Sequence, residues 1–171
     1  NSAGFLLNSE LFKEGNISIQ DPAGGLVVTL LDSIKGETIV DGCSAPGGKT
    51  AFIAELMKNK GKILAFDKSQ ERLGRLSSGM KRLSIDIVDA EIKDLTRYRL
   101  PKSNKMILDV PCSGTGVMAK RADLRWRRDM DNLLELHLQQ RKILWEASNS
   151  LKAGGTIVDK VEDIFNDSEI I

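Results

Sequence analysis

The sequence predicts an α/β fold in which helices cover both faces of a mostly parallel sheet. Five short apolar runs alternate along the chain with segments whose apolar residues recur at helical spacing. Runs that are apolar throughout are typical of parallel strands, because such strands are buried on both faces. With 171 residues, the chain is long enough for one domain with a substantial core.

The predicted elements follow one another with short connections. The first 25 residues are rich in glycine and form a lead-in segment, and residues 26–171 form the single domain. The predicted strands are residues 38–40, 62–66, 85–89, 106–108 and 156–158. The predicted helices are residues 26–34 and 50–58, a helix after Asp67 that runs through Arg82, and a helix over residues 133–151.

The composition excludes several classes of protein. Lysine and arginine number 25 against 24 acidic residues, so the chain is no wholesale polycation, although a local basic surface stays possible. The apolar runs fall far short of the roughly 18 residues that span a bilayer, and no secretory leader pattern is visible. Two cysteines make neither a disulfide framework nor a structural zinc site. We expect a cytoplasmic, metal-free protein without membrane contact.

Carboxylates end several predicted strands, namely Asp41, Asp67, Asp89 and Asp109. A single aspartate at such a position is most often only the N-cap of the next helix. Four of them along one edge indicate more, because ligands of open α/β sheets bind outside the carboxyl ends of the strands. This edge is the candidate site.

The loop after the first strand, residues 41–50, combines two glycines and a proline directly before a helix. Such a loop lets a ligand approach the backbone and the free N–H groups of the helix. Gly-Lys-Thr suggests a P-loop ATPase, but that template requires glycine or alanine where Cys43 stands. Asp67, 18 residues after Lys49, is placed to accept both ribose hydroxyls of an adenosine group. Spacing alone does not distinguish S-adenosylmethionine from NAD.

The loop after the fourth strand begins with Asp109 and continues as Val-Pro-Cys-Ser-Gly-Thr-Gly. It brings a carboxylate and the thiol of Cys112 to the rim of the same site. A free cysteine is usually a small buried apolar residue. In a polar, glycine-rich turn next to Pro111, however, the thiol is expected to be partly accessible.

Together, the motifs Asp-x-Cys-x-Ala-Pro-Gly-Gly-Lys-Thr and Asp-x-Pro-Cys-Ser-Gly-Thr-Gly make the chain resemble the S-adenosylmethionine-dependent RNA cytosine-5 methyltransferases. The bacterial 16S ribosomal RNA enzymes of the Sun/RsmB type and their NSUN relatives are the most similar members. The resemblance extends from about Ile17 to Val158, and Gly116-Val117 with Arg121, Asp123 and Trp126 matches a further signature of the family.

The resemblance implies a Rossmann-like methyltransferase domain over residues 26–171, with its C-terminal strands incomplete. It implies that Asp67 holds the ribose of S-adenosylmethionine, that Asp89 lies beside the adenine and that Asp109 lies near the methyl group and the target base. The residues implied to cradle the methionine part are Cys43, Ser44, Ala45, Pro46, Gly47, Gly48 and Lys49.

The implied reaction transfers a methyl group to C5 of cytosine in RNA, with small-subunit ribosomal RNA as the expected substrate, through a cysteine–C6 covalent intermediate. In the family the nucleophile is a cysteine in a Thr-Cys motif after the fifth strand, and the Pro-Cys cysteine, here Cys112, assists product release. Here the chain reads Asp-Lys-Val-Glu after Val158. Either a segment that carries the nucleophile is missing at this point, which we favour, or the chain is a non-catalytic module that binds cofactor or RNA.

The densest basic cluster surrounds an aromatic residue, a combination suited to phosphate contact and base stacking. A solvated helix face with the tryptophan turned into the core is an equal alternative. The cluster consists of Lys120, Arg121, Arg125, Trp126, Arg127 and Arg128. We expect these residues to contact RNA, and we expect a monomer.

Overall fold

The computed structural model describes residues 2–111 and 130–159. Within them, five strands form a single sheet in the order β3-β2-β1-β4-β5, and every neighbouring pair is parallel. The strands are β1 (Thr38–Gly42), β2 (Lys62–Asp67), β3 (Val88–Ile92), β4 (Ser103–Leu108) and β5 (Leu151–Asp159). The predicted parallel, doubly wound α/β fold is confirmed. The predicted incompleteness of the C-terminal strands concerns the chain after Asp159, which lies outside the described residues.

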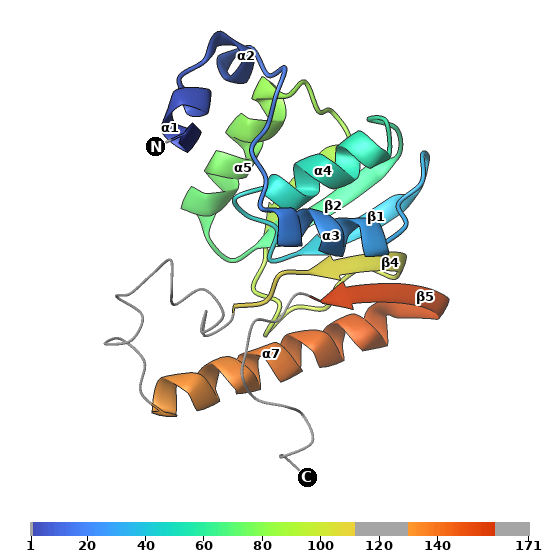
Figure 1. Ribbon diagram of the computed structural model, residues 1–171. Coiled ribbons are helices and arrows are strands. Elements are labelled where there is room, and N and C mark those ends of the chain that lie inside the picture. Colours follow the sequence, from blue (N-terminus) through green and yellow to red (C-terminus); the bar gives the residue numbers. More distant parts are fainter. Residues whose placement is uncertain (1, 112–129, 160–171) are drawn as a thin grey trace.

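Helices cover both faces of the sheet (Figure 1). Helices α3 (Pro22–Leu30), α4 (Gly48–Leu56) and α5 (Gln70–Arg82) pack on one face, and α7 (Met130–Ser150) packs on the other. Neighbouring strand residues point to opposite faces: Ile39 joins the core under α3 and α4, whereas Val40 joins the core under α7. Both are 0% exposed, which explains why the strands are apolar throughout.

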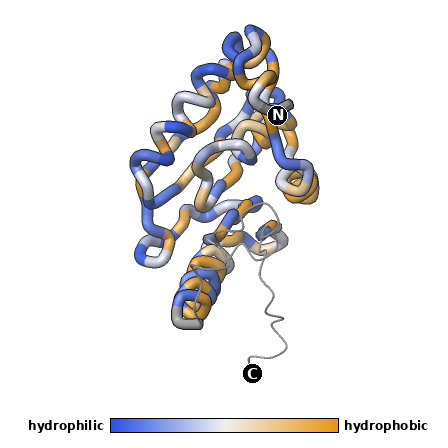
Figure 2. The backbone as a smooth tube through the Cα atoms, turned by 60° about the vertical axis from the view of Figure 1, so that its left-hand side comes forward, coloured by the Kyte–Doolittle hydropathy of each residue, from blue (hydrophilic) through white to orange (hydrophobic). Residues whose placement is uncertain are grey.

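Helix α7 shows the mixed colouring of an amphipathic helix, with hydrophilic and hydrophobic segments following one another (Figure 2). Its residues Ile143 and Ala147 are buried against the sheet, whereas Leu144 and Trp145 are exposed. The predicted helix over residues 133–151 is therefore confirmed, with its start three residues earlier.

Several boundaries differ from the prediction, and three of the differences concern the site or the domain division. Helix α3 starts at Pro22, with Asp21 as its N-cap, so the predicted division between residues 25 and 26 falls inside this helix. Strand β3 starts at Val88 rather than residue 85. Strand β5 starts at Leu151, because the predicted break at Gly154-Gly155 is an irregularity within the strand, where the pairing with β4 shifts.

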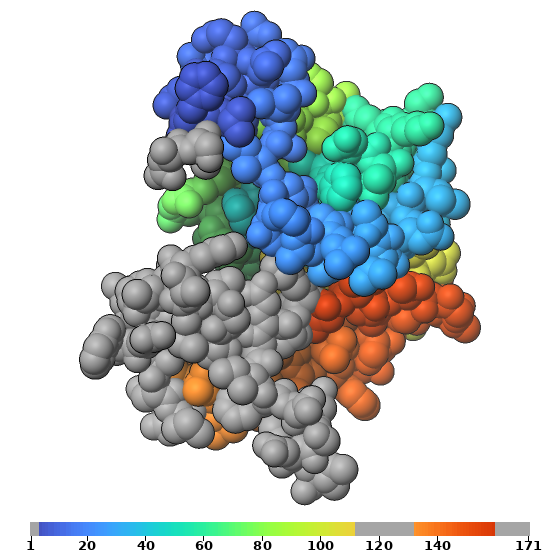
Figure 3. Space-filling model, in the orientation of Figure 1, coloured from blue at the N-terminus to red at the C-terminus, as the bar shows by residue number. Residues whose placement is uncertain are grey.

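The N-terminal segment, with α1 (Ser2–Leu7) and α2 (Glu10–Lys13), lies beside α5 at one end of the molecule (Figures 1 and 3). Arg82, at the end of α5, binds the N-terminal segment to this helix. The Arg82 guanidinium donates to the carbonyls of Phe12 at 2.5 Å and Ile17 at 3.1 Å and lies 3.9 Å from the centre of the Phe12 ring.

Candidate functional site

Three of the four predicted carboxylates meet at the carboxyl edge of the sheet. Asp41 and Asp67 lie at the ends of β1 and β2, and Asp109 directly follows β4. Strand β1 lies between β2 and β4, so the chain crosses to opposite sides of β1 at this point. Ligands of open α/β sheets bind at such a topological switch point.

Asp89 does not belong to this edge, and the prediction that it ends a strand is wrong. It is the second residue of β3, pairs with Leu64 near the beginning of β2, and forms an ion pair with Lys62 at 3.3 Å. Its side chain is 65% exposed. The alternation at residues 85–89 reflects the lead into the strand, where the Ile87 carbonyl accepts from Ile63 N at 2.8 Å.

The loop between β1 and α4 folds back onto the end of β2. The backbone N–H and the hydroxyl of Ser44 both donate to the Phe66 carbonyl, at 2.8 and 3.1 Å, and Ala45 N donates to the Asp67 carboxylate at 3.3 Å. The Ala45–Pro46 peptide bond is cis. The loop is therefore fixed by β2, the strand that carries Asp67.

Gly47 ends this loop as the N-cap of α4, with a φ of 104°. A Cβ at Gly47 would lie 2.9 Å from Leu76 Cγ in α5, so only glycine fits. Since glycine has no side chain, no side-chain cap closes the start of α4. The first N–H groups of the helix are thus left for a ligand.

The Asp67 carboxylate is held from several directions and is 3% exposed as a residue. Ser69 N donates to Oδ1 at 2.9 Å, and the Arg72 guanidinium lies 3.4 Å from Oδ2. Arg72 also donates to the Ala45 carbonyl. Arg72 therefore links the glycine-rich loop to Asp67 from the outside, where its own side chain is 46% exposed.

Lys49 and Asp109 join the two functional loops directly. The Lys49 ammonium lies 2.5 Å from Asp109 Oδ2, across 60 residues of sequence. Such a short, charge-assisted bond orients the Asp109 carboxylate toward the start of α4.

Asp41 lies beneath this pair, 1% exposed. Thr50 donates a hydrogen bond of 2.6 Å to Oδ2, whereas Oδ1 has no partner among the described residues. The pKa of Asp41 is raised to about 7, chiefly by burial and also by nearby Asp109 and Asp67, against the opposing effects of Thr50 and Lys49. A buried, half-satisfied carboxylate suits a cationic ligand group.

Cys43 is held as a neutral thiol. Burial raises its pKa to about 12, with a further contribution from Asp67, Asp41 and Asp109. Because the thiolate is the nucleophile of cysteine chemistry, Cys43 is unsuited to attack and instead forms part of the wall of the site.

A cavity of about 410 Å³ opens between Asp67 and Asp109. Leu95, Ile143 and Val110 supply apolar walls, and Lys68, Arg72, Lys93 and Asp94 supply charged ones. Asp94 also lines this cavity, and the sequence interpretation did not single it out. It follows β3 by two residues, and hydrogen bonds from Thr96 lower the pKa of its carboxyl, which keeps it ionised as an acceptor.

A second cavity of about 200 Å³ adjoins the start of α4. Its polar lining comprises Gln20, Asp21, Asp41, Ser44, Lys49 and Asp109. Asp109 lines both cavities, so the two compartments meet at this carboxylate.

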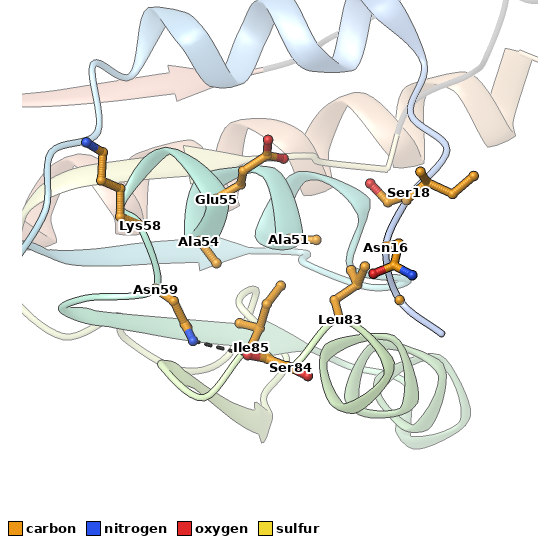
Figure 4. A pocket seen from close by; sticks show the side chains of 12 residues that line it. Asn16, Ser18, Ala51, Ala54, Glu55, Lys58, Asn59, Leu83, Ser84 and Ile85 are labelled. Atoms are coloured by element: carbon orange, nitrogen blue, oxygen red, sulfur yellow. Dashed lines mark hydrogen bonds between the residues drawn. The ribbon is translucent and has the colours of Figure 1, made fainter. Parts of the chain in front are cut away.

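A third cavity, of about 500 Å³, lies between α4 and the N-terminal segment. Figure 4 shows Ala51 and Ala54 of α4 on the side of Leu83 and Ile85, with Asn16 and Ser18 of the N-terminal segment at one end. No predicted site residue lines this cavity, so its larger volume does not make it the candidate site.

Several predicted site residues lie outside the described residues. They are Cys112 and the basic cluster of Lys120, Arg121, Arg125, Trp126, Arg127 and Arg128. Within the described part of the chain, no group of three metal-ligating side chains occurs. No helix there has the length and apolar character needed to cross a membrane.

Comparison with known proteins identifies relatives of this fold and site. The profile of the family described as 16S rRNA methyltransferase RsmB/F matches residues 28–160. The probable ribosomal RNA small subunit methyltransferase B of Bacillus subtilis (strain 168) is 35% identical over 159 residues, which cover 91% of this chain and 36% of that protein. The tRNA (cytosine(72)-C(5))-methyltransferase of Pyrococcus horikoshii is 34% identical over 151 residues, which cover 86% of this chain and 38% of that protein.

Among solved structures, NSun6 from Pyrococcus horikoshii with SFG superimposes with a TM-score of 0.86 and 30% identity, over 96% of this chain and 43% of that one. The chain thus spans little more than a third of the length of the curated relatives it matches. The family profile covers most of the chain, including β1, β2, β4, β5 and both functional loops. The chain belongs to the 16S rRNA methyltransferase RsmB/F family.

Proposed function

We propose that the chain forms the catalytic domain of an S-adenosylmethionine-dependent enzyme that methylates C5 of cytosine in RNA, with 16S ribosomal RNA as the substrate. The observation that carries this proposal is the meeting of two cavities at Asp109, beside the loop that the family shares. Two compartments suit a two-part cofactor whose reactive sulfonium lies between an adenosine half and an amino-acid half.

The larger cavity fits the adenosine half. Asp67 would accept the two ribose hydroxyls and Asp94, rather than Asp89, would accept the amino group of adenine. Because Asp67 is already contacted by the Arg72 guanidinium, the ribose hydroxyls would take over that position. Arg72 is 46% exposed and has room to swing outward.

The smaller cavity fits the amino-acid half by charge. The open N-terminus of α4 suits a carboxylate. The unpartnered Oδ1 of Asp41 suits an α-ammonium group. An S-adenosylmethionine analogue is the ligand of the NSun6 relative, which agrees with this assignment.

Bound S-adenosylmethionine supplies an electrophilic methyl group. Cytosine C5 is a weak nucleophile, so a cysteine thiolate first adds to C6, which turns C5 into an enamine-like carbon. After C5 is methylated, a base removes the C5 proton, and the C6–sulfur bond breaks to release the thiolate. By resemblance to the family, Cys112 assists this release, and the target base leaves any stack to reach the site. Asp109, held by Lys49, would orient the base.

One feature favours a second candidate, a module that binds cofactor or RNA without transferring a methyl group. Asp159 and Lys160 stand where the family has the Thr-Cys motif of the nucleophile. If this chain acts without that cysteine, Cys112 is the remaining candidate nucleophile of the two cysteines in the sequence, since Cys43 is held neutral.

Transfer of a labelled methyl group to 16S ribosomal RNA tests the proposal. We expect label on C5 of cytosine, and binding of S-adenosylmethionine without any transfer would favour the non-catalytic module instead. Asp67→Ala should abolish cofactor binding in calorimetry, whereas the matched control Asp89→Ala should leave it unchanged, because Asp89 lies away from the carboxyl edge. Equal losses in both variants would refute the assigned adenosine site.

RNA contact is proposed for the basic cluster at residues 120–128. Lysines and arginines that neutralise phosphates make the affinity fall steeply with salt. Replacing Arg127 and Arg128 with glutamine should therefore weaken RNA binding and flatten its salt dependence, while cofactor affinity stays the same. An unchanged salt dependence would contradict the proposed RNA surface. A monomeric state and a cytoplasmic location stay predictions.

A further inference from the structure

Gln140 is a polar residue on the buried face of α7. This face repeats every three or four residues and otherwise packs against the sheet; its most buried members are Gln140 at 7% exposed, Ile143 at 4%, Ala147 at 0% and Ser150 at 4%. A carboxamide in such a position destabilises the fold unless it is hydrogen-bonded. At this buried position, the Gln140 carboxamide therefore requires a hydrogen-bond partner.

That partner is the loop that follows β4. Gln140 Nε2 donates a hydrogen bond of 2.9 Å to the carbonyl of Pro111, two residues after Asp109. The same short segment is held at two further points. Asp109 N donates to the Gly42 carbonyl in β1 at 3.2 Å, and Val110 is buried in the core cluster that contains Ile143. Gln140 supplies the contact at the end of the segment.

We propose that Gln140 is a positioning residue for the reaction. Its side chain holds residues 109–111 in place, so that the Asp109 carboxylate meets Lys49. The expected effect on methyl transfer rests on the proposed function, whereas the fixing of residues 109–111 by Gln140 rests on the contacts alone. The carbonyl of Pro111 is coplanar with the peptide bond that leads to Cys112. Fixing this carbonyl therefore also fixes the direction in which the chain leaves the sheet.

The fold alone does not explain the choice of glutamine. Methionine has nearly the same length and volume, lacks a polar group to desolvate, and is usually tolerated in cores. Among the contacts of the described residues, methionine at position 140 would lose the hydrogen bond that the carboxamide donates to Pro111. The contact links α7 to the very loop that carries Asp109, across 29 residues of sequence.

The test compares Gln140→Met with Ala147→Gly in the same protein. Ala147 lies two turns further along the same buried face and lines neither site cavity, and glycine there destabilises α7 without touching Pro111. Three quantities are measured: the single-turnover rate of methyl transfer, the dissociation constant of S-adenosylmethionine, and the hydrogen-exchange rates of the Asp109 and Val110 amides.

We expect Gln140→Met to lower the transfer rate about tenfold, because misplacement of a reacting group by a fraction of an ångström has effects of this size. The KM for RNA and the cofactor affinity should stay within about twofold of the parent. The Asp109 and Val110 amides should exchange faster in Gln140→Met but not in Ala147→Gly.

Equal exchange of these two amides in both variants, or an unchanged transfer rate in Gln140→Met, would overturn the inference. A parent protein that transfers no methyl group would refute the proposed function instead. In that case the exchange rates alone decide: faster exchange only in Gln140→Met supports the positioning role, and equal exchange overturns it.

Discussion

Replacing Gly47 with alanine should destabilise the protein severely, although it adds a single methyl group. Gly47 has a φ of 104°, a backbone conformation that costs an L-residue roughly 1–2 kcal/mol. The added Cβ would lie 2.9 Å from Leu76 Cγ and 3.2 Å from Met80 Cε. Leu76 is 0% exposed and has no space to retreat, so overpacking adds roughly 1–3 kcal/mol. We expect a total loss of about 2–5 kcal/mol.

The neighbouring glycine is a matched control. A Cβ at Gly48 would meet no atom within 4 Å, and Gly48 is the first residue of α4, where alanine is the better helix former. Urea unfolding gives the free energy of unfolding of Gly47→Ala, Gly48→Ala and the parent. We expect Gly48→Ala to be as stable as the parent or more stable by up to about 1 kcal/mol. A Gly47→Ala protein within about 0.5 kcal/mol of the parent would refute the packing of the loop against α5.

Three further predictions concern titration, reactivity and anchoring. The pKa of Asp41 is about 7 in the folded protein against 3.8 when unperturbed, so the folded state binds the proton more tightly and stability falls as pH rises from about 4 to 7. Asp41→Asn should remove this slope and gain up to roughly 4 kcal/mol above pH 7, as pH-dependent urea unfolding would reveal. Because burial raises the pKa of Cys43 to about 12, iodoacetamide at pH 8 should leave it unmodified until the protein unfolds, as mass spectrometry of the Cys43 peptide can check. Arg82→Ala should expose the N-terminal helices to limited proteolysis, whereas Arg75→Ala should not, since Arg75 pairs with Glu71 of the same helix and with no other residue in the part of the chain that the structure describes.

The fold class could be predicted because both faces of the sheet are covered. Strands β1, β2 and β4 are central, so their residues are apolar on either side and stand out in the sequence. Strand β3 lies at the edge and is largely exposed, with an intermediate residue followed by four exposed ones. Its sequence carries no apolar run that marks its end, which is why Asp89 was predicted to end the strand although it is the second residue of β3.

The carboxyl edge could be predicted, but the contacts that organise it could not. The sequence places Asp41, Asp67 and Asp109 at strand ends, and parallel pairing then brings them together. The bond between Lys49 and Asp109 joins residues 60 positions apart. No local pattern specifies such a pair, because it depends on the order of the strands and on the direction in which α4 leaves the loop.

The charges around the glycine-rich loop also argue against the P-loop interpretation that its Gly-Lys-Thr sequence suggests. In a P-loop, the lysine is free to reach phosphates, whereas Lys49 is bound to Asp109 at 2.5 Å. Asp67, Asp41 and Asp109 all raise the pKa of Cys43, so negative potential prevails at the centre of the loop despite the opposing effect of Arg72. A triphosphate would be repelled from this centre, and a sulfonium with its α-ammonium would relieve the mutual repulsion of the carboxylates. The electrostatics therefore favour a cationic adenosyl cofactor, for a reason that the Gly-Lys-Thr sequence alone does not contain.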